Sequence, residues 1–259
     1  MFPRFIVCAA LCLCGAVTVR AGDEALPSVD EVIAKYIEVI GGRKAVDSIK
    51  TLHMTGKMVF AGGMEAPLTL DIKRPGKVRV EFTLQGMTGT QAFDGETGWF
   101  VMPFAGKPDP EKMPPDMLKD IKQQADFDGP LVDYKKKGHK VEMVGVDEFE
   151  GTPVYKLKVT RADGDVEYHL LDKELFILLA IKGTRDFQGT PIEYEVALGD
   201  YKEVNGVLVP HSIDQKGGGG PGGMTISLDK IEANLDIPDS RFAMPEKKSE
   251  KPNADKQGD

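Results

Sequence analysis

The chain has 259 residues, of which 33 are basic and 41 acidic, for a formal net charge of −8 at pH 7. Because an acidic surface repels phosphate backbones and anionic headgroups, this composition excludes nucleic acid as a favoured partner. The length suits one sizeable β domain, and no shift in composition divides it.

The first 21 residues have the pattern of a secretory signal peptide. Arg4 precedes an apolar run over residues 5–19, and small residues lead up to Ala21. The run is short for a membrane-spanning helix, which needs about 20 apolar residues. We therefore expect cleavage after Ala21 and export to the periplasm, rather than an uncleaved membrane anchor.

All three cysteines, at positions 8, 12 and 14, lie in this leader. The mature chain therefore has no disulfide, no thiolate metal site and no cysteine nucleophile. Cleavage also removes Arg4 and Arg20, which leaves 31 basic and 41 acidic residues and a net charge of −10.

Two helices are predicted at the start of the mature chain. Ser28 and Glu31 have the spacing of a capping box, and apolar residues then recur at helical intervals as far as Ile40. Gly41-Gly42 ends this helix. Residues 43–50 form a second, shorter helix with one apolar side.

From Thr51 the apolar residues alternate with polar ones, which is typical of strands with one buried face. About five strands are expected before residue 104, separated by turns at glycine-containing pairs such as Pro75-Gly76 and Asp94-Gly95. The clearest is residues 77–84, "KVRVEFTL", in which the apolar residues all share one face.

Residues 104–137 interrupt this pattern. Residues 104–116 are rich in proline and are not expected to pair in a sheet. A helix with proline near its first turn and a thin apolar stripe is predicted over residues 114–127. A second helical piece is predicted over residues 130–138, and the whole insert is a candidate lid.

Alternation resumes at His139. It predicts about seven further strands, at residues 139–149, 152–161, 165–172, 176–187, 190–202, 206–216 and 223–235. Within "DYKEVNGVLVPHSI" (200–213), Asn205-Gly206 is a strong hairpin signal, so His211 is interpreted as part of the sheet architecture. The glycine-rich stretch at 216–223 is expected to be a floppy hairpin loop.

The order of elements predicts an α+β fold that is mainly β. We expect one large curved antiparallel sheet, an incomplete barrel of roughly 11–12 strands wrapped around a few lid helices. A single domain would span residues 22–245, and the charged residues 246–259 would form a disordered tail.

No group of residues in the sequence has a catalytic or metal-binding pattern. The histidines His53, His139, His169 and His211 lack metal-ligand spacing, and each is interpreted as a surface residue on a strand. No serine lies in a nucleophile elbow, and the glycine-rich stretch lacks the Gly-Lys-Ser/Thr end of a phosphate loop. The sequence predicts no enzyme, no cofactor and no metal.

The chain does offer an apolar lining. Side chains fill the concave face of a small closed barrel, whereas a wider or open sheet leaves a cavity for a ligand. Methionines of the first strands, such as Met54 and Met58, would adapt to the shape of a ligand. The alternative is that the helices fill the concavity and the core is solid, and the sequence pattern leaves both possibilities open.

Several stretches resemble the LolA/LolB family of periplasmic lipoprotein carriers. They are "IKRPGKVRVEF" (72–82), "FDGETGWFVMPF" (93–104), "NGVLVPHSI" (205–213) and "NLDIPDSRFAMPE" (234–246). The opening "YIEVIGGRKAVDSIKTLHMTGKM" (36–58) is similar to a broader set of exported lipoprotein-sorting proteins. The resemblance implies an incomplete antiparallel barrel around lid helices, which binds lipoprotein acyl chains in its concavity and carries them between membranes.

The resemblance also implies individual site residues. Arg74 falls on the family arginine that hydrogen-bonds the lid and holds it shut; the alternative is an arginine that braces a turn. Trp99, the only tryptophan, either lines the cavity or seals the core. The predicted lining consists of Met54, Met58, Leu70, Val80, Phe82 and Trp99.

The expected function is therefore a monomeric, non-enzymatic periplasmic protein that binds the acyl chains of a lipid or lipoprotein. Its partners would be membrane-bound donor and acceptor proteins. The alternative is an interaction or sensor module of the cell envelope, with the same fold and a filled core. The proline-rich insert, the glycine loop and the charged tail are not part of the family pattern.

Overall fold

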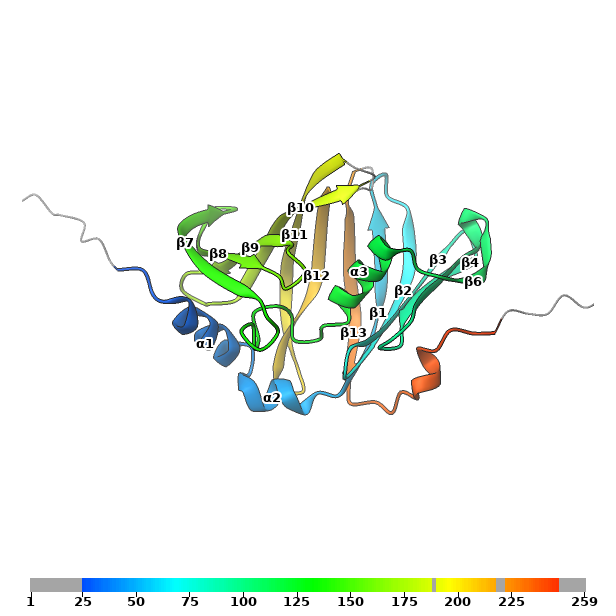
Figure 1. Ribbon diagram of the computed structural model, residues 1–259, viewed down its shortest axis with the longest axis horizontal. Coiled ribbons are helices and arrows are strands. Elements are labelled where there is room, and N and C mark those ends of the chain that lie inside the picture. Colours follow the sequence, from blue (N-terminus) through cyan, green and yellow to red (C-terminus); the bar gives the residue numbers. More distant parts are fainter. Residues whose placement is uncertain (1–24, 188–189, 218–221, 247–259) are drawn as a thin grey trace, which may run out of the picture.

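The computed structural model describes residues 25–187, 190–217 and 222–246 (Figure 1). In this part of the chain, thirteen antiparallel strands form one curved sheet that does not close, in the order β6-β5-β4-β3-β2-β1-β13-β12-β11-β10-β9-β8-β7. The predicted signal peptide, the centre of the glycine loop and residues 247–259 of the tail lie outside the described residues.

The helices are α1 (Val29–Val39), α2 (Gly42–Ser48) and α3 (Pro115–Gln124), with short 3-10 turns η1 (Pro103–Ala105) and η2 (Asp239–Arg241). The strands of the first half are β1 (Thr51–Phe60), β2 (Glu65–Lys73), β3 (Lys77–Leu84), β4 (Met87–Phe93), β5 (Gly98–Met102) and β6 (Lys107–Lys112). Those of the second half are β7 (Lys140–Phe149), β8 (Thr152–Thr160), β9 (Val166–Asp172), β10 (Leu178–Phe187), β11 (Thr190–Val204), β12 (Val207–Gly217) and β13 (Met224–Ala233).

The topology places the segment between the two sets of strands across the sheet. β1 pairs with β2 on one side and with β13 on the other, so the two halves meet at β1. β6 is one edge of the sheet, and β7, the next strand in the chain, is the opposite edge. Residues 113–139 must therefore span the width of the sheet, and Figure 1 shows this segment, with α3, in front of the central strands.

The helices cover one face of the sheet, called here the concave face. α1 begins with the predicted capping box, in which Ser28 accepts from the Glu31 backbone N–H and Glu31 accepts from Ser28. α1 packs Val32 and Ile33 against the second half of the sheet, and α2 packs against β1 and β12. α3 packs against β3, β4 and β5.

The junction between α1 and α2 is tied to the predicted Asn205-Gly206 hairpin. Gly41 has a φ of 120°, and a Cβ there would collide with the carbonyl oxygen of Gly206, so only glycine fits. Leu208 N–H donates to the Ile40 carbonyl across the same contact. Asn205 and Gly206 both have positive φ, as the two-residue hairpin turn requires.

The fold prediction is confirmed, with three corrections. The proline-rich residues 104–116 contain β6, which pairs only with β5; prolines at 108 and 110 are tolerated because an edge strand has one unpaired side. That strand brings the total to thirteen. The predicted helix at 130–138 is wrong, because positive φ at Gly129, Asp133 and Gly138 makes this stretch a series of turns.

Candidate functional site

The strand register brings five of the six predicted lining residues onto the concave face. Met54 pairs with Leu70, and Leu70 pairs with Val80 on the next strand, so the three share a face. Phe82 and Met58 follow at even spacing on β3 and β1. Met54 and Met58 are buried in the core, whereas Leu70, Val80 and Phe82 are only half-buried.

The prediction that Trp99 lines the concave face is wrong. Trp99 pairs with Ala92 and Lys112, one residue out of step with the pair Phe93–Gly98 of the concave face. Its side chain is 1% exposed, and its Nε1–H donates to the carbonyl of Phe242 at 2.8 Å. Trp99 therefore seals the convex face under the C-terminal segment, which was the alternative role.

An ionic network fixes that C-terminal segment on the convex face. Arg241 donates through Nε to the buried Asp71 at 2.9 Å and also pairs with Glu81. Asp239 accepts from Lys73 and Lys77, each at 2.8 Å. These contacts hold residues 237–242 over β2, β3 and β5.

α3 contacts both halves of the sheet, one through its apolar side and the other through its polar side. Its apolar side, with Leu118 and Ile121, packs on Val78 and on Phe100 of the first half. Its polar side faces the turn between β8 and β9, where Lys119 Nζ lies 2.6 Å from Asp165 Oδ1. Further polar contacts join Gln123 to Asp163 and Asp165, and Arg185 to Asp120.

Arg74, the residue of the predicted lid contact, follows β2 directly and contacts α2 and the turns after α3. Its Nε–H donates to the Ile49 carbonyl at 2.8 Å, and Nη2 donates to the Val46 carbonyl at 3.2 Å at the end of α2. Its guanidinium also makes a bidentate pair with Asp128 at 2.6 and 2.5 Å. The same group lies 4.3 Å from the ring centroid of Phe127. Arg74 thus holds α2 and the turns after α3 together.

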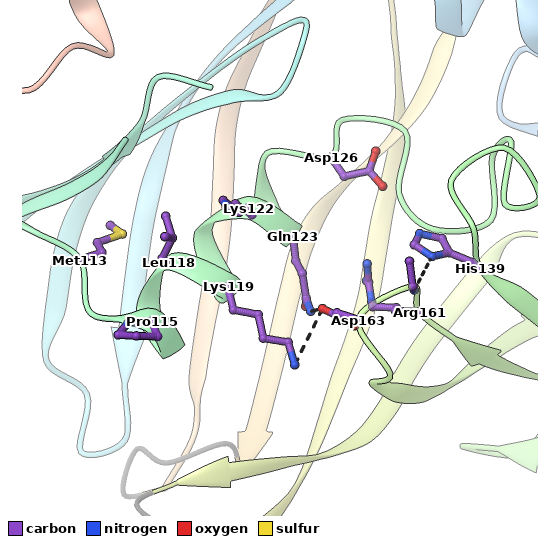
Figure 2. Close-up of a pocket in the computed structure, with 11 residues that line it drawn as sticks. Met113, Pro115, Leu118, Lys119, Lys122, Gln123, Asp126, His139, Arg161 and Asp163 are labelled. Atoms are coloured by element: carbon purple, nitrogen blue, oxygen red, sulfur yellow. Dashed lines mark hydrogen bonds and ion pairs between the residues drawn. The ribbon is translucent and has the colours of Figure 1, made fainter. Parts of the chain in front are cut away.

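A groove of 540 Å³ opens beside α3, between this helix and the turn that joins β8 to β9 (Figure 2). One end is apolar, Arg161 and His139 lie at the other, and Lys119 and Lys122 lie between the two ends (Figure 2). The lining residues are Met113, Pro115, Leu118, Lys119, Lys122, Gln123, Asp126, His139, Arg161, Ala162 and Asp163. None of the six predicted lining residues contributes to this groove.

A buried polar cluster lies behind the groove on β9. Arg161 Nε–H donates to Glu167, and His169 Nε2 lies 3.4 Å from the other Glu167 carboxylate oxygen. Burial opposes ionisation of Glu167, but His169 and Arg161 outweigh it and lower the pKa of Glu167 to about 2. Glu167 is therefore an anion in the interior, with the Arg161 guanidinium as its hydrogen-bond donor.

The sequence interpretation missed this cluster and misplaced two histidines. His169 is 0% exposed and His211 is buried, so neither is the surface residue that was expected. The signal was the alternation of "VEYHLL": Glu167 and His169 share a face with the buried Leu171. His53 and His139 are partly exposed, and His53 Nδ1 lies 2.6 Å from Asp71 Oδ1.

Two further observations concern the described residues only. No three histidine, cysteine, aspartate or glutamate side chains in residues 25–187, 190–217 and 222–246 are grouped closely enough to ligate a metal ion. Within the same ranges, no helix combines the length and apolar character needed to span a bilayer.

The structure belongs to the class of open antiparallel β-barrels whose concave face is covered by helices. In this chain, residues 113–139 also cross that face from one edge strand to the other. No protein-family model matches the sequence, and no curated protein matches it. Solved structures, in contrast, share the architecture over most of the chain.

Three of these structures are representative. A DUF1329 family protein from Desulfovibrio piger superposes with a TM-score of 0.58 at 10% identity, covering 84% of this chain and 98% of its own. A LolA superfamily protein from Nitrosomonas europaea gives 0.56 at 12% identity, with the same coverage of 84% and 98%. A domain assigned to outer membrane lipoprotein sorting in Vibrio parahaemolyticus gives 0.55 at 13% identity, covering 83% and 97%.

At these identities the likeness establishes the fold. The LolA-like architecture expected from the sequence resemblance is therefore confirmed, over more than four fifths of the chain.

Proposed function

We propose that this chain is an exported lipid-binding protein that holds acyl chains between the apolar face of β1–β3 and α3. One observation carries the proposal. Leu70, Val80 and Phe82 form a contiguous, half-buried apolar surface, and the helix beside it is held on its far side by exposed ion pairs. Apolar area under a removable cover is what binding of an acyl chain requires.

Moving α3 away from the apolar surface breaks only weak ion pairs on its polar side. The side chains of Lys119, Asp163 and Asp165 are 41%, 40% and 43% exposed, and exposed ion pairs contribute about 0–1 kcal/mol each. Each methylene of an acyl chain that leaves water gains about 0.8 kcal/mol. A chain of about ten buried methylenes therefore offsets the ion pairs and much of the packing that α3 gives up.

The finer role that we propose is that of a carrier in the periplasm. It would receive the acyl chains of a lipid or lipoprotein from a membrane-bound donor and pass them to a membrane-bound acceptor, working as a monomer. The signal-peptide pattern of residues 1–21 supports export. The fold shared with a lipoprotein-sorting domain supports the substrate class. Such binding needs no catalytic group, and we propose no enzymatic activity.

A second candidate is an interaction or sensor module of the cell envelope. The observation that favours it is the burial of Met54 and Met58 in a core cluster with residues of α2. That end of the concavity is filled, which supports the filled-core alternative that the sequence left open. The two candidates differ in whether a bound lipid exists.

The test uses displacement of the neutral dye Nile red by methyl palmitate from the chain that begins at Gly22. We expect Phe82→Glu to abolish binding, because the carboxylate would be placed in the apolar face beside Phe104, 5.5 Å away between ring centroids. Thr83→Glu, on the opposite face of β3, is the matched control and should bind like the wild type.

Circular dichroism would check that both variants are folded. Wild-type binding by a folded Phe82→Glu variant would refute the placement of the acyl chain. Failure of the wild type to bind any acyl compound would favour the interaction module.

A further inference from the structure

The groove beside α3 is locally cationic in a protein that is acidic overall. Lys119, Lys122 and Arg161 all line it (Figure 2), whereas the whole chain carries a formal net charge of −8. Both carboxylates in the lining are already engaged. Asp126 pairs with Lys137 at 2.5 Å, and Asp163 faces Gln123 and Lys119 at 3.4 and 3.8 Å.

Two of the three cations have donors left over. Arg161 uses Nε for Glu167, and among the described residues its two Nη atoms have no hydrogen-bond partner. The side chain is only 11% exposed, and it lines the groove. Lys122 Nζ lies 5.7 Å from the centroid of the Phe93 ring and makes no ion pair within the described part of the chain. The groove therefore presents free cationic donors on a largely buried arginine and an exposed lysine.

The position of Arg161 is fixed from two directions. Its backbone closes the turn between β8 and β9, where Arg161 N–H donates to Asp165 and Gly164 N–H donates to Arg161. Its Nε is held by the buried, ionised Glu167. A guanidinium anchored at Nε keeps its two Nη atoms pointing the same way, which is the geometry that suits a carboxylate or a phosphate.

His139 adds a neutral donor to the same end of the groove. Ala162 N–H donates to His139 Nδ1 at 3.0 Å, so the proton of the neutral ring resides on Nε2. Burial lowers the pKa of His139, and the charges of Arg161 and Lys137 lower it further. The His139 ring is thus an uncharged hydrogen-bond donor near neutral pH.

The opposite end of the groove is apolar and lies at the start of α3. Met113, Pro115 and Leu118 form an apolar wall, and Leu118 packs so closely on β5 that a Cβ on Gly98 would lie 2.7 Å from its Cδ1. Leu118 belongs to the same cluster as Leu70 and Val80 of the proposed acyl surface. The groove and the apolar face are therefore the two sides of one helix.

We propose that this groove binds the anionic headgroup, a carboxylate or a phosphate monoester, of an amphiphile whose acyl chain enters beneath α3. The inference rests on the proposed function and adds a substrate class to it. Arg161 and Lys122 pair with the anion, His139 donates to it, and the first methylenes lie on the apolar wall. The acidic outer surface repels bulk anions, so only a ligand with an acyl chain gains enough from burial to enter.

The test compares charged and neutral ligands of the same chain length. Palmitate and hexadecyl phosphate are compared with methyl palmitate and hexadecanol in displacement of Nile red from the chain that begins at Gly22. We expect at least one of the two anions to bind about tenfold more tightly than its neutral counterpart at low salt. The anion that shows the preference identifies the headgroup, and added salt should reduce it.

Two variants and a control locate the effect. Lys122→Glu and Arg161→Gln should each reduce the preference for the anion to within about twofold, with neutral ligands binding as before. Lys230→Glu makes the same change in net charge as Lys122→Glu at an exposed position on β13, and it should keep the preference. Because Lys122 is exposed, its variant tests the site even if Arg161→Gln is unstable without the Glu167 pair.

The outcomes separate this inference from the proposed function. Equal affinity for charged and neutral ligands in the wild type would refute the headgroup site and leave acyl binding intact. A preference that survives in both groove variants would place the anion elsewhere. No binding of any of the four ligands would refute the proposed function itself, and the headgroup site with it.

Discussion

Replacement of Arg74 by alanine is the perturbation whose cost the structure defines best. The side chain makes hydrogen bonds to the Ile49 and Val46 carbonyls, a bidentate pair with Asp128, and a stacking contact with Phe127. Arg74→Ala removes all of these at once. It also leaves the Asp128 carboxylate without its guanidinium partner in a largely buried site.

The size of the stability loss follows from how deeply the Arg74–Asp128 pair is buried. Removing one member of a fully buried ion pair costs about 3–5 kcal/mol, whereas an exposed pair contributes about 0–1 kcal/mol. The side chains of Arg74 and Asp128 are 22% and 14% exposed, which places them near the buried limit. We therefore expect a loss of about 2–4 kcal/mol in the free energy of unfolding.

Urea denaturation, followed by fluorescence of the single tryptophan, measures this loss. The midpoint should fall by about 1 M or more. Arg74→Lys should recover less than half of the loss, because an ammonium cannot reproduce the bidentate geometry.

Arg185→Ala is the matched control. Its side chain is 39% exposed, pairs with Asp120 at 3.3 Å and lies 5.5 Å from the centroid of the Tyr194 ring, so its removal should cost at most about 1–2 kcal/mol. If Arg74→Ala and Arg185→Ala lowered the stability by the same small amount, the reasoning that makes Arg74 the main tie to the covering elements would be refuted.

Three further predictions test other parts of the account. Phe242→Ala should cost about 3–5 kcal/mol and red-shift the emission of Trp99, because Phe242 is fully buried and its carbonyl accepts from the indole N–H; an unchanged spectrum would contradict this placement. A short thiol crosslink between Gln123→Cys and Asp163→Cys, whose native side chains lie 3.4 Å apart, should block acyl uptake, and uptake equal to that of the uncrosslinked double variant would argue against a moving α3. The folded-state pKa of Glu167 is lowered to about 2 from the ordinary 4.5, so the stability that ionised Glu167 contributes is complete above pH 4.5 and is lost as pH falls towards 2. Urea denaturation should therefore show the difference in stability between wild type and Glu167→Gln closing over that range. A difference that stays constant with pH would contradict this prediction.

The regular parts of the fold could be predicted from the sequence because period and turn chemistry agree there. The strand bounds of the second half match the prediction to within one or two residues at most ends, since glycine-containing turns separate clear runs of alternation. The α1 capping box was also visible, because a Ser-x-x-Glu pattern satisfies backbone donors locally.

The predictions that failed, for Trp99 and for β6, concern strands whose surroundings the sequence does not reveal. Gly98, Trp99 and Phe100 are all buried, because α3 covers one side of β5 and the C-terminal segment covers the other. Alternation cannot assign a face to such a run, so Trp99 was placed on the wrong side. β6 was missed because proline is excluded from central strands, and the sequence does not say which strand is the edge.

The candidate site divides in the same way. The alternation placed Val80 and Phe82 on one face of their strand, and the register puts that face on the concave side of the sheet. The groove and the Glu167–His169 cluster were missed, because they depend on α3 crossing the sheet between its two edges. The order of strands in the sheet causes that crossing, and the sequence does not reveal this order. In the sequence alone, polar residues of a strand that face the concavity cannot be distinguished from solvent-exposed ones.

The central claim is that an acyl chain occupies the concave face beneath α3. The most direct test is to purify the exported protein without detergent and combine native mass spectrometry with lipid extraction. The account predicts one acylated species per chain, with a carboxylate or phosphate headgroup. A mass that matches the bare chain and stays unchanged after incubation with lipids and a diacylated peptide would contradict the account and favour the interaction module.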